Sequence, residues 1–162
     1  VVVLDKGIQN GLKKEKKEIT LLRPKETSEA HVDLLSAAKS CLNILEDKKI
    51  FSDYIIVATE IFPNKEHGYF DKLIKNIHNK NYDLIFPIIN QKGFIWKKNL
   101  VSKKYEMIIN GFQPTKLKNE EVYLSRPGYG FIIRPELLRV ANINSNKIGY
   151  MKIFDSEYFK EI

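Results

Sequence analysis

The first ninety residues alternate between short apolar runs and segments that carry an apolar stripe at helical spacing. The apolar runs are residues 1–4, 19–22, 53–58 and 82–89. Their β-branched composition is typical of strands buried on both faces, and strands that alternate with helices pair in parallel through right-handed crossovers. The order β-α-β-α-β-α-β therefore predicts an α/β fold with a mainly parallel sheet, in which ligands bind at the carboxyl ends of the strands.

Two of the segments between these runs have clear helical stripes. The first stripe extends from Leu34 to Leu45, and we expect Thr27 or Ser28 to cap the N-terminus of this helix. The second covers residues 70–77, where apolar side chains recur three and four residues apart.

The pattern changes after Asn90. Further strands are expected at 94–97, 105–109, 131–134 and 148–154, with a short helix at 135–140. The length of 162 residues suits one hydrophobic core, so we treat 1–162 as a single domain. Its parts are a β-α core (1–93), an inserted region (94–134) and a return to the sheet (135–162).

Composition excludes several classes of protein. Apolar residues make up 43% of the chain and charged residues 29%, which is typical of globular rather than disordered chains. No apolar run approaches the ~20 residues that span a membrane, and the first residues lack the pattern of a secretory signal. The single cysteine, Cys41, excludes an internal disulfide and a multi-cysteine zinc site. A cytoplasmic protein without a membrane partner is expected.

The net charge of +7 raises the question of a polyanionic partner. The lysines are scattered, and groups such as Lys13 to Lys17 are interrupted by glutamate. Because nucleic-acid binding needs a basic stripe or an aromatic platform, we favour a solvated, lysine-rich surface. A basic domain associated with nucleic acid is kept as an alternative.

Standard phosphate-binding and hydrolase motifs are missing. The sequence has no P-loop, and the pair Gly128 and Gly130 lacks the third glycine of a dinucleotide-binding loop. Of the three histidines, His67 is the best placed for a ligand, because it lies in the loop after the strand at 53–58.

Several short motifs occur in an order that resembles one enzyme family. One strand ends at Asp5, another ends in R-P-K-E at 23–26, and strands led by Asp53 and Tyr82 follow. Over most of its length the chain resembles the sugar cytidylyltransferases, which include the CMP-N-acetylneuraminate synthetases. That family has a V-x-S-T-D strand end, an R-P-x-E-x-A segment and a Q-P-T-S-P-L-R loop in this order.

The matches to this family are uneven. Asp5 stands at the T-D, and residues 23–26 match R-P-x-E well. The loop 59–65 stands where Q-P-T-S-P-L-R is expected, and only Pro63 and Lys65 agree. The sequence begins with Val1 rather than Met, inside an expected strand, so we expect residues upstream. The opening A-A-R-x-G-S-K-R loop of the family, which holds the triphosphate, would lie there.

The resemblance implies a fold and a reaction. The fold is a three-layer αβα arrangement of the nucleotide-diphospho-sugar transferase type, with a mostly parallel sheet. In the reaction, a hydroxyl of an acidic sugar attacks the α-phosphate of CTP, pyrophosphate leaves, and Mg²⁺ offsets the developing charge. Such enzymes activate sugars for surface-glycan synthesis and are commonly dimeric through the region after the fourth strand. Residues 94–134, with their aromatic side chains, are therefore expected at a homodimer interface.

Candidate site residues follow from these matches and from the loops at strand ends. Substrate contacts are expected from Arg23, Glu60, Lys65, His67, Arg126, Tyr129 and Arg134. Nucleotide contacts are expected from Asp5 and Thr59, and a metal contact from Asp155. Three of them have a structural alternative: an ion pair for Arg23, a solvated position for Lys65, and a helix cap for Asp155.

A non-catalytic relative is the main competing function. Such a module would keep the sheet and bind a nucleotide or sugar without turnover. The nature of the sugar acceptor, and whether CTP is the nucleotide, stay open because the loop at 59–65 differs from that of the family.

Overall fold

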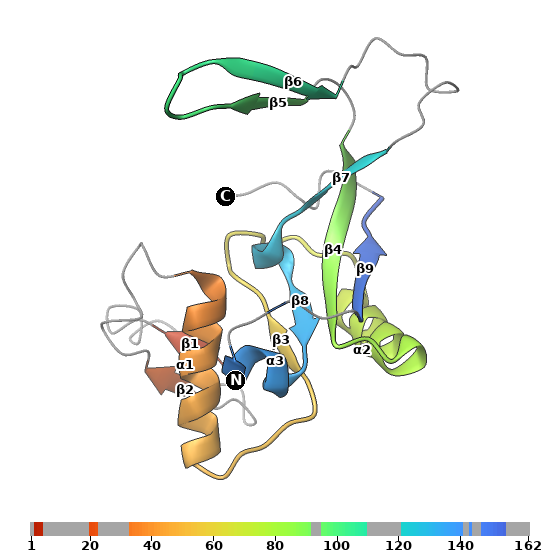
Figure 1. Ribbon diagram of the computed structural model, residues 1–162. Helices are drawn as coiled ribbons and strands as arrows, with labels where there is room; N and C mark the ends of the chain where they lie inside the picture. The colour runs from red at the N-terminus through yellow and green to blue at the C-terminus, as the bar shows by residue number, and fades with distance from the viewer. Residues whose placement is uncertain are drawn as a thin grey trace.

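The computed structural model describes residues 2–4, 20–22, 33–91, 95–109, 121–140, 143 and 147–154 (Figure 1). The two N-terminal strands, β1 (Val2–Leu4) and β2 (Thr20–Leu22), pair in parallel, with Val3 opposite Leu21. Their direction agrees with the parallel pairing expected from the sequence.

The main sheet contains five strands. They are β3 (Ile55–Val57), β4 (Leu84–Gln91), β7 (Val122–Ser125), β8 (Phe131–Ile133) and β9 (Ile148–Lys152). The strand β8 lies between β3 and β4 and is antiparallel to both. The strand β7 is also antiparallel to β4, and β9 pairs with β4 in parallel.

The expected mostly parallel, three-layer αβα sheet is wrong. Only one of the four strand pairings in the main sheet, β4 with β9, is parallel. The alternation in the first ninety residues covers β3, α2 and β4, which are consecutive in the chain, and β3 and β4 do run in the same direction. A later segment, β8, enters between them in the opposite direction, and the local periodicity of 53–89 contains no information about that insertion.

The N-cap of helix α1 (Leu34–Asp47) is Asp33. The expected caps, Thr27 and Ser28, lie outside the described residues. The Asp33 carboxylate accepts hydrogen bonds from the backbone N–H groups of Leu35 and Ser36, at 2.9 and 3.0 Å, and from the Ser36 hydroxyl at 2.6 Å. These hydrogen bonds, led by the one from the Ser36 hydroxyl, lower the pKa of Asp33. The helix therefore has an N-cap that satisfies two of its free N–H groups.

The helix α2 (Tyr69–Lys80) follows Gly68 and is followed by Asn81, and both flanking residues have left-handed backbone angles, with φ of 69° and 50°. Glycine and asparagine adopt this conformation most readily, so the sequence sets both ends of the helix. The short helix α3 (Pro135–Val140) begins with proline, which needs no hydrogen-bond acceptor there.

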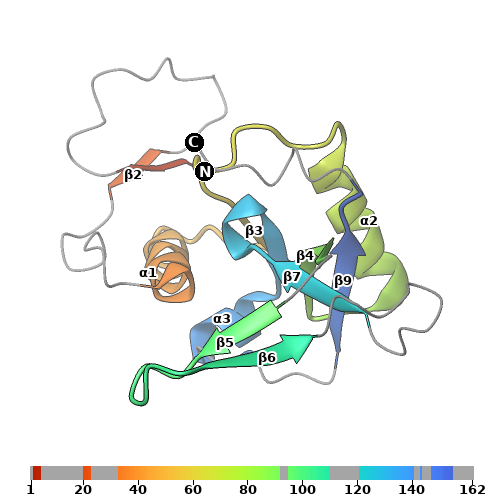
Figure 2. The ribbon, with the colours of Figure 1, turned by 90° about the horizontal axis from the view of Figure 1, so that it is seen from above.

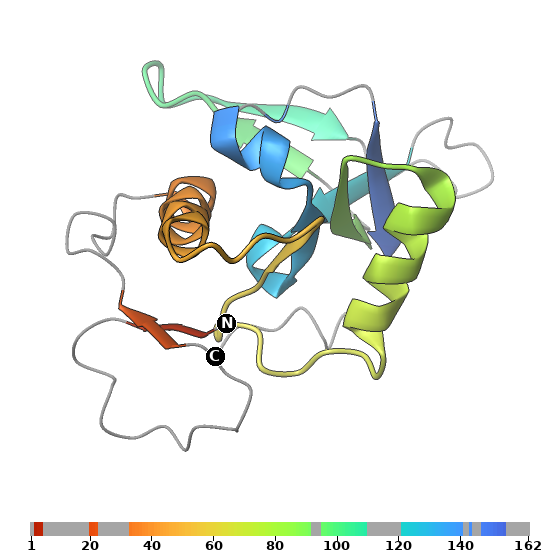
Figure 3. The ribbon, with the colours of Figure 1, turned by 90° about the horizontal axis from the view of Figure 1, so that it is seen from below.

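Helices cover both faces of the main sheet, α2 on one side and α1 with α3 on the other (Figures 2 and 3). On the α2 side, Leu73 and Ile77 pack with Ile85 and Ile132 of the strands. The cluster on the other side contains Leu42, Leu84, Phe131, Ile133 and Leu138. Because successive strand residues point to opposite faces, the continuous apolar run of β8 supplies both clusters.

The remaining strands, β5 (Ile95–Lys98) and β6 (Tyr105–Ile109), form a separate antiparallel hairpin (Figure 1). It lies beyond the carboxyl end of β4, away from the helices. Among the described residues, no helix is both long and apolar enough to cross a membrane.

Candidate functional site

The strands β7 and β8 run along the same edge of β4 and are separated by a bulge. Ile88 of β4 lies opposite Ser125, and Ile85 lies opposite Ile132. From Ile85 to Ile88, β4 advances by three residues, whereas the segment paired with it advances by seven residues from Ser125 to Ile132. Four extra residues of that segment therefore leave the ladder. They form a single 3₁₀ turn, Pro127–Tyr129, with its flanking residues (Figure 1). Bulges of this kind redirect side chains and are frequent next to active sites.

Pro87 of β4 accounts for the position of the bulge. The carbonyl of Ile88 accepts from the N–H of Ile153, 2.8 Å away on the β9 side. Because neighbouring residues of a strand point their backbone groups to opposite edges, the nitrogen of Pro87 faces the β7 and β8 side. Proline has no N–H to donate there, so one of the two hydrogen bonds of a ladder pair cannot form at this position, and the paired segment loses less by leaving the sheet here than elsewhere.

The bulge is fixed to the end of β3 through Thr59. The backbone N–H and the hydroxyl of Thr59 both donate to the carbonyl of Gly128, at 2.9 and 3.1 Å. A Cβ atom on Gly128 would lie 2.8 Å from Oγ1 of Thr59 and 3.2 Å from Cε2 of Phe62. A side chain at position 128 would force these neighbours to shift, which is a physical reason for glycine there.

Two buried tyrosines support the bulge from the α2 side. The hydroxyl of Tyr69 donates to the carbonyl of Gly130, and the hydroxyl of Tyr129 accepts from the N–H of Glu66 at 3.1 Å. The two rings meet edge to face, with centroids 4.8 Å apart. Burial raises the pKa of Tyr69, so its phenol stays protonated and keeps donating.

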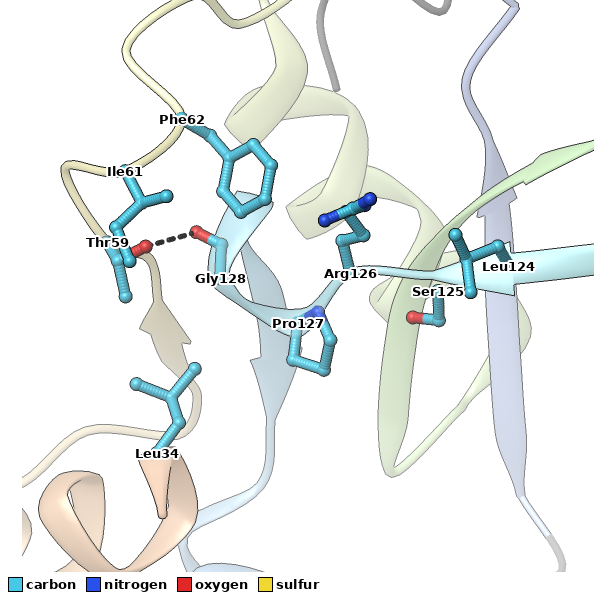
Figure 4. Close-up of a pocket in the computed structure, with 9 residues that line it drawn as sticks. All are labelled: Leu34, Thr59, Ile61, Phe62, Leu124, Ser125, Arg126, Pro127 and Gly128. Atoms are coloured by element: carbon cyan, nitrogen blue, oxygen red, sulfur yellow. Dashed lines mark hydrogen bonds between the residues drawn. The ribbon is translucent and has the colours of Figure 1, made fainter. Parts of the chain in front are cut away.

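A cavity of about 600 Å³ that is open to solvent lies between the end of β3 and the bulge (Figure 4). Its lining residues are Leu34, Thr59, Ile61, Phe62, Leu124, Ser125, Arg126, Pro127 and Gly128. Figure 4 shows Thr59, Ile61 and Phe62 on one side, facing the segment 125–128. The lining is apolar apart from the Thr59 hydroxyl, one guanidinium and backbone groups. Pockets for small ligands have this size and this mixture of a mainly apolar wall with a few polar groups.

Ser125 lines the cavity without offering its hydroxyl to it. Its Oγ atom is fully buried, and within the described part of the chain it has no hydrogen-bond partner. A buried hydroxyl without a partner is unfavourable by about 1–3 kcal/mol. Ser125 is the last residue of β7, so the start of the bulge holds its hydroxyl in place.

Among the sequence candidates, Thr59 and Arg126 line this cavity. Tyr129 lies behind it, buried against Phe62 with ring centroids 6.0 Å apart. Lys65 is half-buried; its ammonium donates to the carbonyl of Phe62 and lies 5.6 Å from the centroid of the Tyr129 ring. Burial lowers the pKa of Lys65. Lys65 therefore supports the wall of the cavity from outside rather than lining it.

The remaining described candidates lie elsewhere. Glu60 and His67 are exposed in the loop between β3 and α2. Arg134 is at the opposite end of β8, where Nε lies 3.1 Å from Oδ1 of Asp83 and the guanidinium lies over the ring of Tyr54. Since Tyr54 precedes β3 and Thr59 follows it, the structure separates Arg134 from Arg126, although the two flank the same glycines in the sequence.

Three predicted contacts, Asp5, Arg23 and Asp155, lie outside the described residues. The residues that the structure does describe include no group of three or more His, Cys, Asp or Glu side chains that could hold a metal ion. The expected magnesium stays a prediction.

Sequence reasoning missed Leu34, Ile61, Phe62 and Ser125 as cavity residues. The three apolar side chains look like ordinary core or loop residues, and β7 was not expected as a strand. The one available signal was Pro87, because a proline inside a long apolar strand marks an edge or a bulge. When the sequence was compared with models of known protein families and with curated proteins, neither comparison found a match.

Proposed function

We propose that the chain takes part in transferring CMP from CTP to an acidic sugar, and that the cavity beside Thr59 and Arg126 binds one of the two substrates. The order of motifs in the sequence supports the choice of reaction. The single structural observation that supports it is the cavity itself, at the carboxyl end of β3, with one guanidinium in a mainly apolar wall.

The chemistry of the wall suits an anionic ligand with an apolar portion. The planar guanidinium of Arg126 matches the geometry of a phosphate or carboxylate and can form two parallel hydrogen bonds with it. Leu34, Ile61 and Phe62 offer apolar surface for a base or for the less polar face of a sugar. Thr59 donates to Gly128, so its hydroxyl oxygen keeps a lone pair for a ligand donor.

In the proposed reaction, a hydroxyl oxygen of the sugar forms a bond to the α-phosphorus of CTP. The bond from that phosphorus to the bridging oxygen breaks, pyrophosphate leaves, and the hydroxyl proton passes to solvent. Negative charge increases on the phosphate oxygens during this step. A guanidinium beside the reacting phosphate, such as that of Arg126, would stabilise that charge.

The direct test is a pyrophosphate-release assay on the protein expressed from its full reading frame. Each of the four nucleoside triphosphates is supplied in turn with a panel of acidic sugars and Mg²⁺. We expect release with CTP and one sugar acid. Pyrophosphate release with another triphosphate would replace CTP as the assigned nucleotide. If a folded protein released no pyrophosphate with any combination, that result would contradict the transfer reaction.

The same protein distinguishes the non-catalytic alternative. A binding module predicts no pyrophosphate release but a saturable shift in melting temperature with a nucleotide or sugar, since a ligand that binds only the folded state stabilises it. A domain associated with nucleic acid predicts neither result, and instead binding to nucleic acid that weakens steeply with salt.

A further inference from the structure

The β5–β6 hairpin exposes both of its faces. Trp96 lies opposite Met107 and Lys98 lies opposite Tyr105, so these four side chains share one face. The pair Lys97 and Glu106 points to the other face. All residues from 96 to 108 are exposed. An uncovered two-stranded hairpin is marginally stable in water, so a surface that covers this one would stabilise it.

The tip of the hairpin is nevertheless well formed. The side chain of Asn99 accepts from the N–H groups of Val101 and Ser102, at 2.9 and 3.0 Å. Its backbone N–H donates to the carbonyl of Lys104 at 2.9 Å. These bonds hold residues 99–104 in a defined turn, as asparagine side chains often do.

This turn presents aliphatic side chains to solvent. Leu100 is 74% exposed and Val101 is 94% exposed. Turn positions are normally polar or glycine, because an exposed aliphatic group there gains nothing from folding. Two adjacent aliphatic residues at the most distant point of a projecting hairpin therefore indicate contact with an apolar environment.

Positive charge surrounds the aliphatic tip. Lys97, Lys98, Lys103 and Lys104 flank Leu100 and Val101 in the sequence and are all exposed. Glu106 is the only acidic residue from 95 to 109, so this segment carries a net charge of +3 (four lysines minus one glutamate). The ammonium of Lys98 lies 5.3 Å from the ring centroid of Tyr105.

We propose that the hairpin tip, residues 96–105, docks on the surface of an anionic lipid bilayer. Leu100 and Val101 would enter the boundary between headgroups and acyl chains, while the four lysines meet anionic headgroups. Trp96 and Tyr105 suit the interfacial layer, where amphipathic rings concentrate. This binding takes place at the membrane surface, and it replaces the absence of a membrane partner that was expected from the sequence.

Charge favours the lipid over a second copy of the chain at the tip. Two tips in contact would bring together the four lysines of each, which repel one another. An anionic bilayer instead offers opposite charge and an apolar layer in the same place. Each lysine near such a surface strengthens binding by about fivefold, and burial of an aliphatic side chain adds to this.

The test uses Trp96, which is the only tryptophan of the chain. The protein is mixed with vesicles of phosphatidylcholine alone or with about a third phosphatidylglycerol (a typical anionic membrane content). We expect a blue shift of Trp96 emission and co-sedimentation with the anionic vesicles only. Lipids brominated near the headgroup end of the acyl chain should quench the emission. No shift with anionic vesicles would overturn the proposal.

Matched variants separate the contribution of the aliphatic side chains to vesicle binding from that of the lysines. Leu100→Ser with Val101→Ser should weaken vesicle binding about tenfold or more, whereas Val140→Ser, at an exposed position on α3, should leave it unchanged. Lys103→Gln with Lys104→Gln should weaken it about 25-fold, and Lys75→Gln with Lys80→Gln on α2 should have a smaller effect. Circular dichroism verifies that each variant is folded.

Two other results would overturn the proposal in favour of a different occupant. A blue shift that appears without vesicles and grows with protein concentration, together with a dimer in sedimentation equilibrium, would identify a second copy. Equal binding by the Leu100→Ser, Val101→Ser variant, with full competition by soluble dextran sulfate, would identify a soluble polyanion.

Discussion

Antiparallel strand pairs occur in both the main sheet and the β5–β6 hairpin, but their side chains differ in exposure. Ile132 and Ile133 of β8 are fully buried between helices. In the hairpin, Trp96 is 52% exposed and Tyr105 is 62% exposed. Hydrogen-bonded pairing is common to both regions, so the difference in side-chain burial sets their contributions to stability.

This difference separates the two regions by role. The sheet positions Thr59, at the end of β3, and Arg126, at the bulge, as two lining residues of the cavity, so it determines the shape of the cavity. The hairpin contributes none of the residues that line the cavity. Substitutions in the sheet should therefore change folding and the cavity together, and substitutions in the hairpin should change contacts with other molecules.

The largest effect on stability is expected from Phe131→Ala. Phe131 of β8 is fully buried, and its loss leaves a cavity in the core, so we expect the free energy of unfolding to fall by about 3–5 kcal/mol. The matched hairpin substitution, Tyr105→Ala, should lower it by less than about 1 kcal/mol. Urea denaturation followed by circular dichroism measures both free energies of unfolding. An equal loss of stability from the two substitutions would contradict the stated difference between the sheet and the hairpin.

A smaller effect is expected from Gly128→Ala. The new methyl group would crowd Thr59 and Phe62, which overpacks the joint between β3 and the bulge and destabilises the fold by about 1–3 kcal/mol. Adding Thr59→Ala removes the atom that lies closest to it. The double variant should then be more stable than the sum of the two single changes predicts, and strict additivity of the unfolding free energies would show that the contact does not matter.

The cap of α1 should contribute less again. Asp33→Ala removes the acceptor for two backbone N–H groups and should lower the free energy of unfolding by about 1 kcal/mol at neutral pH. The pKa of Asp33 is lowered in the folded chain, so its stabilising effect is present above the ordinary value of 3.8 and is lost as the pH falls below it. The difference between wild type and variant should therefore shrink in acid, and a difference that does not change with pH would contradict the cap.

The smallest effect on stability is expected at the hairpin tip. Leu100 and Val101 are mostly exposed, so replacing both with serine should change the free energy of unfolding by less than about 0.5 kcal/mol. Thermal unfolding of the isolated protein measures this. A large loss would mean that the tip packs within the chain in solution.

Local sequence patterns predicted the helices and strands better than they predicted the sheet. The stripe from Leu34 to Leu45 and the run at 82–89 correspond to α1 and β4, because burial on one helix face or on both strand faces leaves a direct periodic trace. The position of β8 between β3 and β4 depends on contacts between segments distant in sequence, and no local period encodes it.

The site was predictable to a similar extent. Thr59 and Arg126 were chosen because they lie at a strand end and beside glycines, and both line the cavity. Arg134 was chosen for the same glycines, but β8 carries it to the other end of the sheet. Phe62 and Ser125 carry no polar signature of a ligand, and they became cavity residues through the bulge opposite Pro87.

The most direct test compares two arginines in the pyrophosphate-release assay on the protein from its full reading frame. Arg126 lines the cavity, whereas Arg139 forms an ion pair with Glu46. Glu46 lies twelve residues, or about 18 Å along α1, from the cavity residue Leu34, so Arg139 serves as a control outside the cavity. Arg126→Gln should lower kcat/KM by about 10- to 150-fold, the range for loss of a charged hydrogen bond, and Arg139→Gln should change it less than about twofold. Equal effects of the two substitutions would contradict the assignment of the cavity as the substrate site.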